Sequence, residues 1–240
     1  MKLKDAFTLA EVLITLGIIG VVAAITMPLL INHINGQVFR SKLLKYNSVF
    51  AQAFEQYMNN NGCVGDLRNC LMFSGEGDHN LLWNELGPYF VKAKDCYTEK
   101  SSNCWKQGLM YKYINGSNYT VMDNLSGARA VFPDGAVVRI YDYTGNCTDN
   151  FSKNENGILS NVCGWIQLDV NGSKNPNIVG KDVFMWHITK SGIYPFGGED
   201  DIYYSNENGE PGCDPKSSNI SAPPREGRGN GCTAKFLINK

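Results

Sequence analysis

The chain has 240 residues, of which 43% are hydrophobic and 19% are charged, and its 22 Lys and Arg nearly balance its 23 Asp and Glu. This composition is typical of a globular protein with one sizeable domain and excludes a disordered chain. A net charge of −1 without a basic cluster excludes a general nucleic-acid binder, because phosphate binding needs clustered Lys and Arg. The 3 histidines lie far apart in the sequence and offer little material for a His-based metal or acid–base centre.

The first predicted element is an apolar segment, residues 7–31, in which Glu11 is the one charged residue. As a helix this segment is long enough to span a bilayer. It exceeds the apolar region of a secretory signal peptide, and no small-residue cleavage site follows it. Basic residues flank both ends, so the positive-inside count is indecisive. All 8 cysteines follow the segment and favour an oxidising, exported compartment, which predicts a cytoplasmic N-terminus.

Glu11 needs an explanation, because a carboxylate on a membrane helix is costly and normally has a partner. It can lie at the headgroup level, or it can pair with a group one helical turn away. A third interpretation is functional: cleavage between Ala6 and Phe7 creates an amino group four positions before Glu11.

The short basic leader, residues 2–6, followed by Phe7-Thr8-Leu9-Ala10-Glu11 and a long apolar helix, resembles a type IV prepilin or a type II secretion pseudopilin. The resemblance implies that a prepilin peptidase cleaves between Ala6 and Phe7 and methylates Phe7. It also implies that Glu11 neutralises the terminal amine of a neighbouring subunit in a filament. The family usually has Gly before the cleaved bond, and Ala6 departs from that pattern.

Pro28 lies where members of the family commonly have a helix-bending proline. Proline lacks an N–H and clashes with the carbonyl four residues earlier, so it weakens a helix locally. The resemblance therefore implies that the helix partly melts there when subunits pack. Pro is also common in membrane helices generally, which is the alternative interpretation.

After the apolar segment, large apolar residues recur every three or four positions from Phe39 to Tyr57, which predicts an amphipathic helix with one buried face. Asn59–Gly62 favours a helix end. One long helix is therefore expected from about Phe7 to Asn60.

Strands are predicted further along, where β-branched and aromatic residues cluster between turn residues. A Pro-Asp-Gly turn at 133–135 predicts a hairpin between the first two. The predicted strands are 130–132, 136–141, 165–170, 183–188 and a short edge strand at 193–196.

These elements predict an α+β fold in which a long N-terminal helix, membrane-spanning in its first half, packs on an antiparallel β-meander with disulfide-pinned loops. This is also the pilin architecture that the resemblance implies. The expected divisions are 1–6 leader, 7–31 transmembrane and assembly helix, 32–60 amphipathic continuation, 61–127 variable loop region, 128–197 β-meander and 198–240 disulfide-bounded C-terminal loop.

Eight cysteines permit 105 pairings, and proximity in the sequence favours neighbours. The favoured pairs are Cys63–Cys70, Cys96–Cys104, Cys147–Cys163 and Cys213–Cys232. Zinc is the weaker interpretation, because no C-x-x-C pair occurs and exported cysteines usually pair with each other. The last pair resembles the disulfide-bounded C-terminal loop of many type IV pilins.

A D-x-N-G…P-N…G-x-D pattern spans 169–182 and resembles a segment of some pseudopilins. Asp169, Asn171 and Asp182 carry oxygen ligands that suit Ca²⁺, but the spacing of an EF-hand with its closing Glu is missing. An Asn-Gly turn between strands explains the pattern better. The expectation is therefore no cofactor, with calcium as the minor alternative.

The sequence contains none of the common enzyme motifs, such as G-x-S-x-G, H-E-x-x-H or a Gly-rich phosphate loop, so we expect no enzyme. The resemblance implies a structural subunit of a type IV pilus-like or type II secretion pseudopilus filament. A minor or tip subunit that binds a surface, DNA or secreted cargo is the alternative. An anchored envelope enzyme would need a convergent polar site that the sequence does not show.

The implied partners are other pilin-like subunits, prepilin peptidase and an inner-membrane assembly platform. The implied location is a single pass through the inner membrane before assembly, and afterwards a cell-surface or periplasmic filament.

Overall fold

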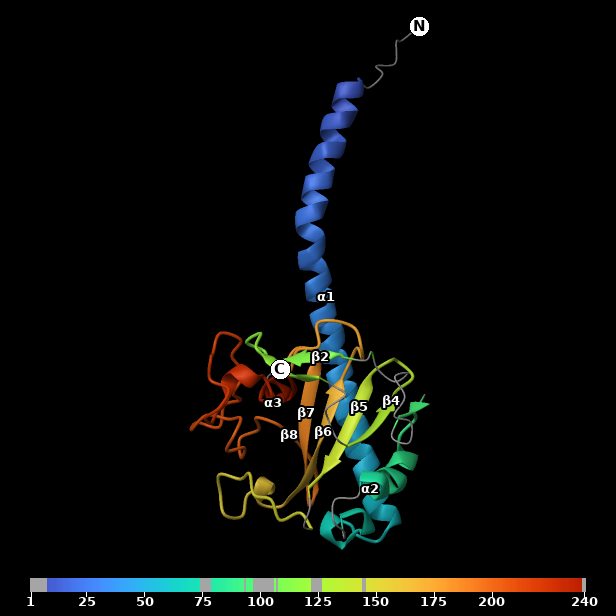
Figure 1. The fold of residues 1–240 in the computed structure, drawn as a ribbon, viewed down its shortest axis with the longest axis vertical. Helices are drawn as coiled ribbons and strands as arrows, with labels where there is room; N and C mark the ends of the chain where they lie inside the picture. The colour runs from blue at the N-terminus through green and yellow to red at the C-terminus, as the bar shows by residue number, and fades with distance from the viewer. Residues whose placement is uncertain are drawn as a thin grey trace. The chain divides into compact units, whose positions relative to one another are not determined.

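The computed structural model describes residues 8–73, 79–92, 94–96, 106, 108–121, 127–143 and 146–238. The chain divides into two compact units, Met1–Arg40 and Ser41–Lys240. Helix α1 runs without a break from Leu9 to Asn60 and contributes to both units (Figure 1). The predicted long helix is thus confirmed, and its C-terminal end is the predicted one.

The second unit is built on a six-stranded antiparallel sheet of order β1-β4-β5-β6-β7-β8. Five of its strands follow one another in the chain and pair in that order, as a meander. A long helix with an antiparallel sheet confirms the predicted α+β class. The strands are β1 (Lys94–Asp95), β4 (Ala128–Val131), β5 (Val137–Asp142), β6 (Val162–Asp169), β7 (Val183–Thr189) and β8 (Gly192–Pro195).

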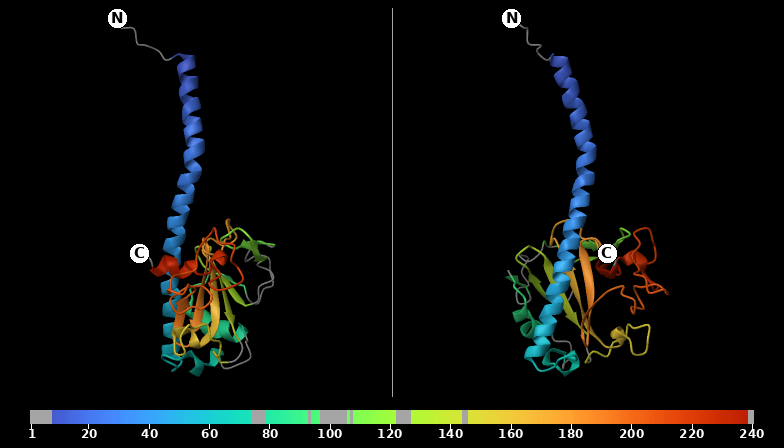
Figure 2. Two further views of the ribbon diagram at one scale, coloured as in Figure 1. Left: turned by 90° about the vertical axis from the view of Figure 1, so that its left-hand side faces the viewer. Right: turned by 180° about the vertical axis from the view of Figure 1, so that it is seen from behind.

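The second half of α1 covers one face of this sheet (Figure 2). The predicted apolar stripe is the reason. Its side chains at Leu43, Tyr46, Phe50, Phe54 and Tyr57 are at most 1% exposed. Burying side chains of this size stabilises by roughly 1.5–3 kcal/mol each, so the stripe is a major part of the core.

Aromatic contacts fix how helix and sheet meet within this unit. The ring of Phe50 lies 5.3 Å from that of Trp186 on β7, and Tyr46 lies 4.7 Å from Phe132. The indole N–H of Trp186 donates to the Asn47 side chain at 2.9 Å. A buried indole needs such a partner, so this bond orients the ring as well as satisfying it.

The predicted Pro-Asp-Gly turn joins β4 and β5 and is tied to α1. Gly135 has a φ of 82°, which glycine adopts without strain. The Asp134 carboxylate accepts from the Tyr46 hydroxyl at 2.6 Å and pairs with Lys45 at 3.0 Å. Burial, reinforced by Asp134, raises the pKa of Tyr46.

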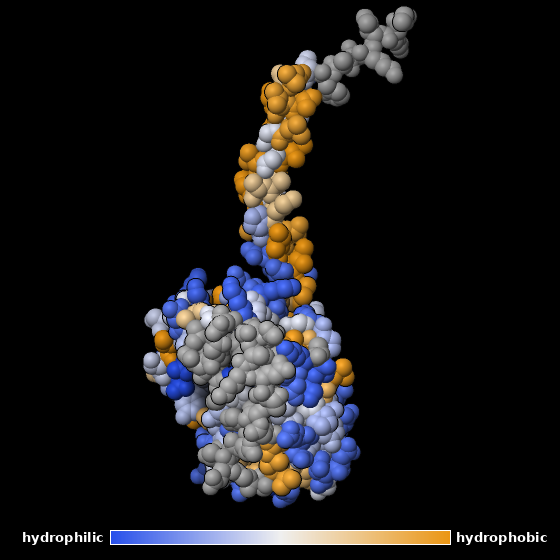
Figure 3. All heavy atoms as spheres, turned by 45° about the vertical axis from the view of Figure 1, so that its right-hand side comes forward, coloured by the Kyte–Doolittle hydropathy of each residue, from blue (hydrophilic) through white to orange (hydrophobic). Residues whose placement is uncertain are grey.

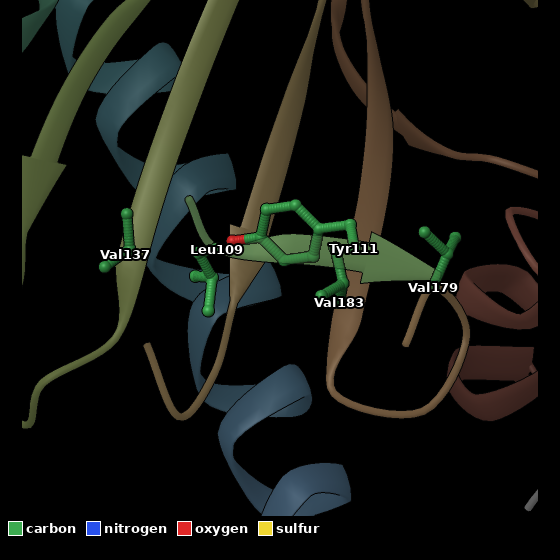
Figure 4. Close-up of a cluster of buried hydrophobic side chains, with 5 residues drawn as sticks. All are labelled: Leu109, Tyr111, Val137, Val179 and Val183. Carbon is green, nitrogen blue, oxygen red and sulfur yellow. The ribbon is translucent and has the colours of Figure 1, made fainter. Parts of the chain in front are cut away.

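A second, two-stranded sheet of β2 (Met110–Lys112) and β3 (Asn118–Val121) packs against part of the other face of the sheet. A cluster of buried side chains holds the two sheets together: Leu109, Tyr111, Val137, Val179 and Val183. Figure 4 shows the Tyr111 ring lying across the sheet between Val137 and Val183. Further along this face, Phe196 packs on Met185 and His187 of β7, and all seven residues of β7 are buried.

Two regions expected to be loops contain further elements. Residues 61–127 include α2 (His79–Leu86) as well as β1, β2 and β3. The C-terminal region includes α3 (Cys232–Ile238), whose Thr233 hydroxyl accepts from the backbone N–H of Met185 on β7 at 2.9 Å. These elements are too short to show a periodic pattern in the sequence. They form because tertiary contacts stabilise them.

Candidate functional site

Three reciprocal hydrogen bonds between Thr8 and Glu11 cap the start of α1. The backbone N–H and the hydroxyl of Thr8 donate to Glu11 Oε2 at 2.9 and 2.8 Å. The backbone N–H of Glu11 donates back to Thr8 Oγ1 at 3.3 Å. This arrangement is a capping box, in which a Thr and a Glu three residues later satisfy each other's N–H groups at a helix start. Glu11 thus has a local partner, and that partner is uncharged.

A local pair was one of the interpretations of Glu11, but the cap itself was not predicted. The T-x-x-E pattern ahead of an apolar run is the signal that predicts it. Both Thr8 bonds end on Oε2, and within the part of the chain that the structure describes no group donates to Oε1. The carboxylate can therefore still accept a hydrogen bond from a cationic group.

The first unit presents an apolar surface around the whole helix. Its Leu, Ile, Val and Met side chains between Leu9 and Ile31 are 42–79% exposed. Figure 3 shows apolar residues along most of the visible face of this part of α1. The helix is long and apolar enough to cross a membrane. It continues through Pro28, so the weakening implied there does not interrupt it in the single chain.

Three of the proposed disulfides are present in the second unit: Cys63–Cys70, Cys147–Cys163 and Cys213–Cys232. Cys96 is also disulfide-bonded, whereas its proposed partner Cys104 lies outside the described residues. The two cysteines of each bridge are 7, 16 and 19 positions apart in the sequence, respectively. The last one ties Cys213 to Cys232, the first residue of α3.

The proposed metal residues lie around the turn between β6 and β7, where the oxygens of the two aspartates accept from protein groups, whereas the buried side-chain oxygen of Asn171 has no hydrogen-bond partner among the described residues. The Asp182 carboxylate accepts from the backbone N–H groups of Asn177 and Ile178 at 2.8 and 2.7 Å. The Asp169 carboxylate accepts from the Tyr111 hydroxyl at 2.9 Å and from the Asn171 N–H at 3.2 Å. Both aspartates thus hold the turn and its contact with the β2–β3 hairpin.

This arrangement favours the turn interpretation of the D-x-N-G…G-x-D pattern. Asp169 and Asp182 are at most 1% exposed. Burial, followed by the neighbouring Asp182, raises the pKa of Asp169 well above its usual range, and burial also raises the pKa of Asp182. Among the described residues, no group of three His, Cys, Asp or Glu side chains could hold a metal ion. The expectation of no cofactor stays a prediction.

Tyr111 belongs to this region although nothing in the sequence predicts it. It comes from a three-residue strand, and 58 positions separate it from Asp169. No local pattern marks such a pairing.

The processing residues, Ala6 and Phe7, lie outside the described residues. Their assignment rests on the sequence around them. Residues 1–27 match the family model described as the prokaryotic N-terminal methylation motif. The chain carries a prepilin-type signal. This is the cleavage and methylation signal of type IV pilins and pseudopilins, which confirms the resemblance. No curated protein and no solved structure matches the chain.

The prepilin-type signal gives the apolar helix and Glu11 of the first unit one functional interpretation. It supports a type IV pilin-like or pseudopilin subunit, and such structural subunits are not enzymes. Together with the apolar helix, the signal fits a membrane-anchored precursor. It also suggests processing by a prepilin peptidase and assembly with other pilin subunits.

Proposed function

We propose that this protein is a structural subunit of a bacterial type IV pilus-like or type II secretion pseudopilus filament. Prepilin peptidase cleaves it between Ala6 and Phe7, methylates Phe7 and so releases it for assembly through α1. The observation that carries the proposal is the prepilin-type signal at residues 1–27, placed directly before an exposed apolar helix.

The exposed helix supports assembly rather than anchoring alone. Once a subunit leaves the membrane, the apolar side chains between Leu9 and Ile31 face water unless other subunits cover them. Burial of apolar surface is the main favourable term in association. A filament of parallel subunits covers this surface along its whole length.

Glu11 supports a defined register in such a filament. It is the one charge within residues 7–31, and the cap leaves its Oε1 able to accept a further bond. Cleavage creates an ammonium group at Phe7, and a carboxylate among apolar side chains is costly without a cation. The Phe7 amine of a neighbouring subunit meets this need and aligns the two helices.

Mass spectrometry of the membrane-purified protein tests the proposal. A mature N-terminus at Phe7 that carries one additional methyl group is the expected result. In a matched culture that lacks prepilin peptidase activity, the protein should retain residues 1–6. Retention of Met1 in cells with an active peptidase contradicts the proposal and identifies Ala6 as a non-functional junction. The abundance of the protein in sheared filaments then separates a major subunit from a minor or tip subunit.

A further inference from the structure

A groove of about 410 Å³ lies along the second half of α1, within the unit Ser41–Lys240. Val49 and Ala53 of α1 line it from one side. Phe132 and Pro133, before β5, and Tyr89 and Val91, after α2, line it from the others. Most of this lining is apolar, and Val91 at its rim is 81% exposed.

The groove contains no unpaired charge among the described residues that line it. Its two charged side chains, Lys45 and Asp134, form an ion pair at 3.0 Å. Asp134 also accepts from the Tyr46 hydroxyl. The remaining polar lining comes from the amides of Gln52 and Gln56, which are uncharged. A partner that brings a charge here would bury it without a counterion, which is costly.

The chain itself supplies an occupant with the matching properties. Its longest stretch without a charged residue is the apolar part of α1 that begins at Val12 and extends past Ile31. These side chains are exposed in the single chain. An uncharged apolar helix is the kind of ligand that an apolar groove binds.

The symmetry of a filament favours the same occupant. An open filament needs two different patches that meet head to tail, because a patch that pairs with itself closes a dimer. The groove on one subunit and the apolar helix of another are such a pair. Resting on the proposed function, we propose that this groove receives the apolar segment Val12–Ile31 of a second copy of the chain.

The length of the groove along α1 agrees with this assignment. The α1 residues that line the groove run from Lys45 to Gln56, which is about 17 Å at 1.5 Å per residue. Three turns of a second helix fit that length.

A pair of exposed valines tests the groove with a matched control. Val91 borders it and is 81% exposed, whereas Val64 lies outside it and is 71% exposed. Val91→Glu places a charge at the rim and is expected to lower incorporation into sheared filaments at least about tenfold. Val64→Glu is expected to leave incorporation unchanged. Because both side chains are exposed, neither variant should change the unfolding midpoint of the full-length protein in detergent.

Photo-crosslinking identifies the occupant. The full-length protein carries benzoylphenylalanine in place of Gln52, which lines the groove, or of Glu55, an exposed α1 residue that does not. Copies labelled with a heavy isotope are co-expressed. The expected result is a crosslink from position 52 of one copy to residues 12–31 of another, absent at position 55.

Failure of this inference can be told apart from failure of the proposed function. If filaments form but position 52 crosslinks to a globular domain, to another protein, to lipid or to nothing, the groove assignment is wrong and the filament subunit remains. Equal incorporation of the two valine variants overturns it in the same way. If the wild-type protein enters no filament, the proposed function itself fails.

Discussion

Replacement of Asp169 by Asn tests the role of the β6–β7 turn. Asp169 is 1% exposed, and burial together with Asp182 raises its pKa well above the usual range. Its carboxylate oxygens accept from the Asn171 N–H and the Tyr111 hydroxyl. In Asp169→Asn the amide oxygen keeps the first bond, and the amide N–H₂ donates to the Tyr111 hydroxyl, which can also accept. The variant thus removes a buried charge and keeps both contacts.

The sign of the pH effect follows from proton linkage. An acid whose pKa is raised by folding binds more protons in the folded state, so stability falls as pH rises through the interval from 3.8 up to the raised pKa. Each pKa unit corresponds to about 1.4 kcal/mol. Replacing charge-assisted hydrogen bonds with neutral ones lowers the free energy of unfolding by about 1 kcal/mol. We therefore expect the free energy of unfolding of Asp169→Asn to exceed that of wild type by about 1 kcal/mol or more at pH 8. This difference should disappear near pH 4.

Denaturant unfolding of the full-length protein in detergent, with disulfides intact and followed by tryptophan fluorescence, measures these differences. Asp169→Ala is the control: it leaves the buried Tyr111 hydroxyl without its acceptor and should lose about 1–3 kcal/mol at both pH values. Lower stability of Asp169→Asn than of wild type at pH 8 contradicts this role of the Asp169 charge. If CaCl₂ also stabilises wild type alone, the turn holds a cation and the calcium alternative is correct.

Three further variants test the other parts of the molecule. Glu11→Ala should leave the protein folded and membrane-inserted but abolish its recovery in sheared filaments, whereas the exposed Glu55→Ala should have no effect; normal yield from Glu11→Ala contradicts the register role. Phe50→Ala, at a fully buried position, should lower the free energy of unfolding by about 3–5 kcal/mol in denaturant titrations, and a loss below 1 kcal/mol argues against the packing described. Replacement of both Cys213 and Cys232 by Ser should cost about 3 kcal/mol and expose the C-terminal region to protease; unchanged resistance contradicts the role of that bridge.

The sequence by itself determined the features that rest on contiguous residues. The prepilin-type signal and the apolar helix need only the identity and spacing of neighbouring residues. The stripe from Leu43 to Tyr57 follows from helical periodicity, and the Pro-Asp-Gly turn follows from local backbone preferences. The Thr8–Glu11 cap belongs to the same class, since a four-residue pattern marks it.

Only the tertiary structure decided the features that join distant residues. The strands β1, β2 and β3 are too short to carry a periodic pattern. They form because pairing with other strands stabilises them. The role of Asp169 depends on Tyr111, which folding brings to it from another sheet. The groove likewise exists only after α1, the β4–β5 turn and the segment after α2 have packed together. Local sequence fixes backbone preferences and polarity, but a site built from separate segments appears only when folding brings those segments together.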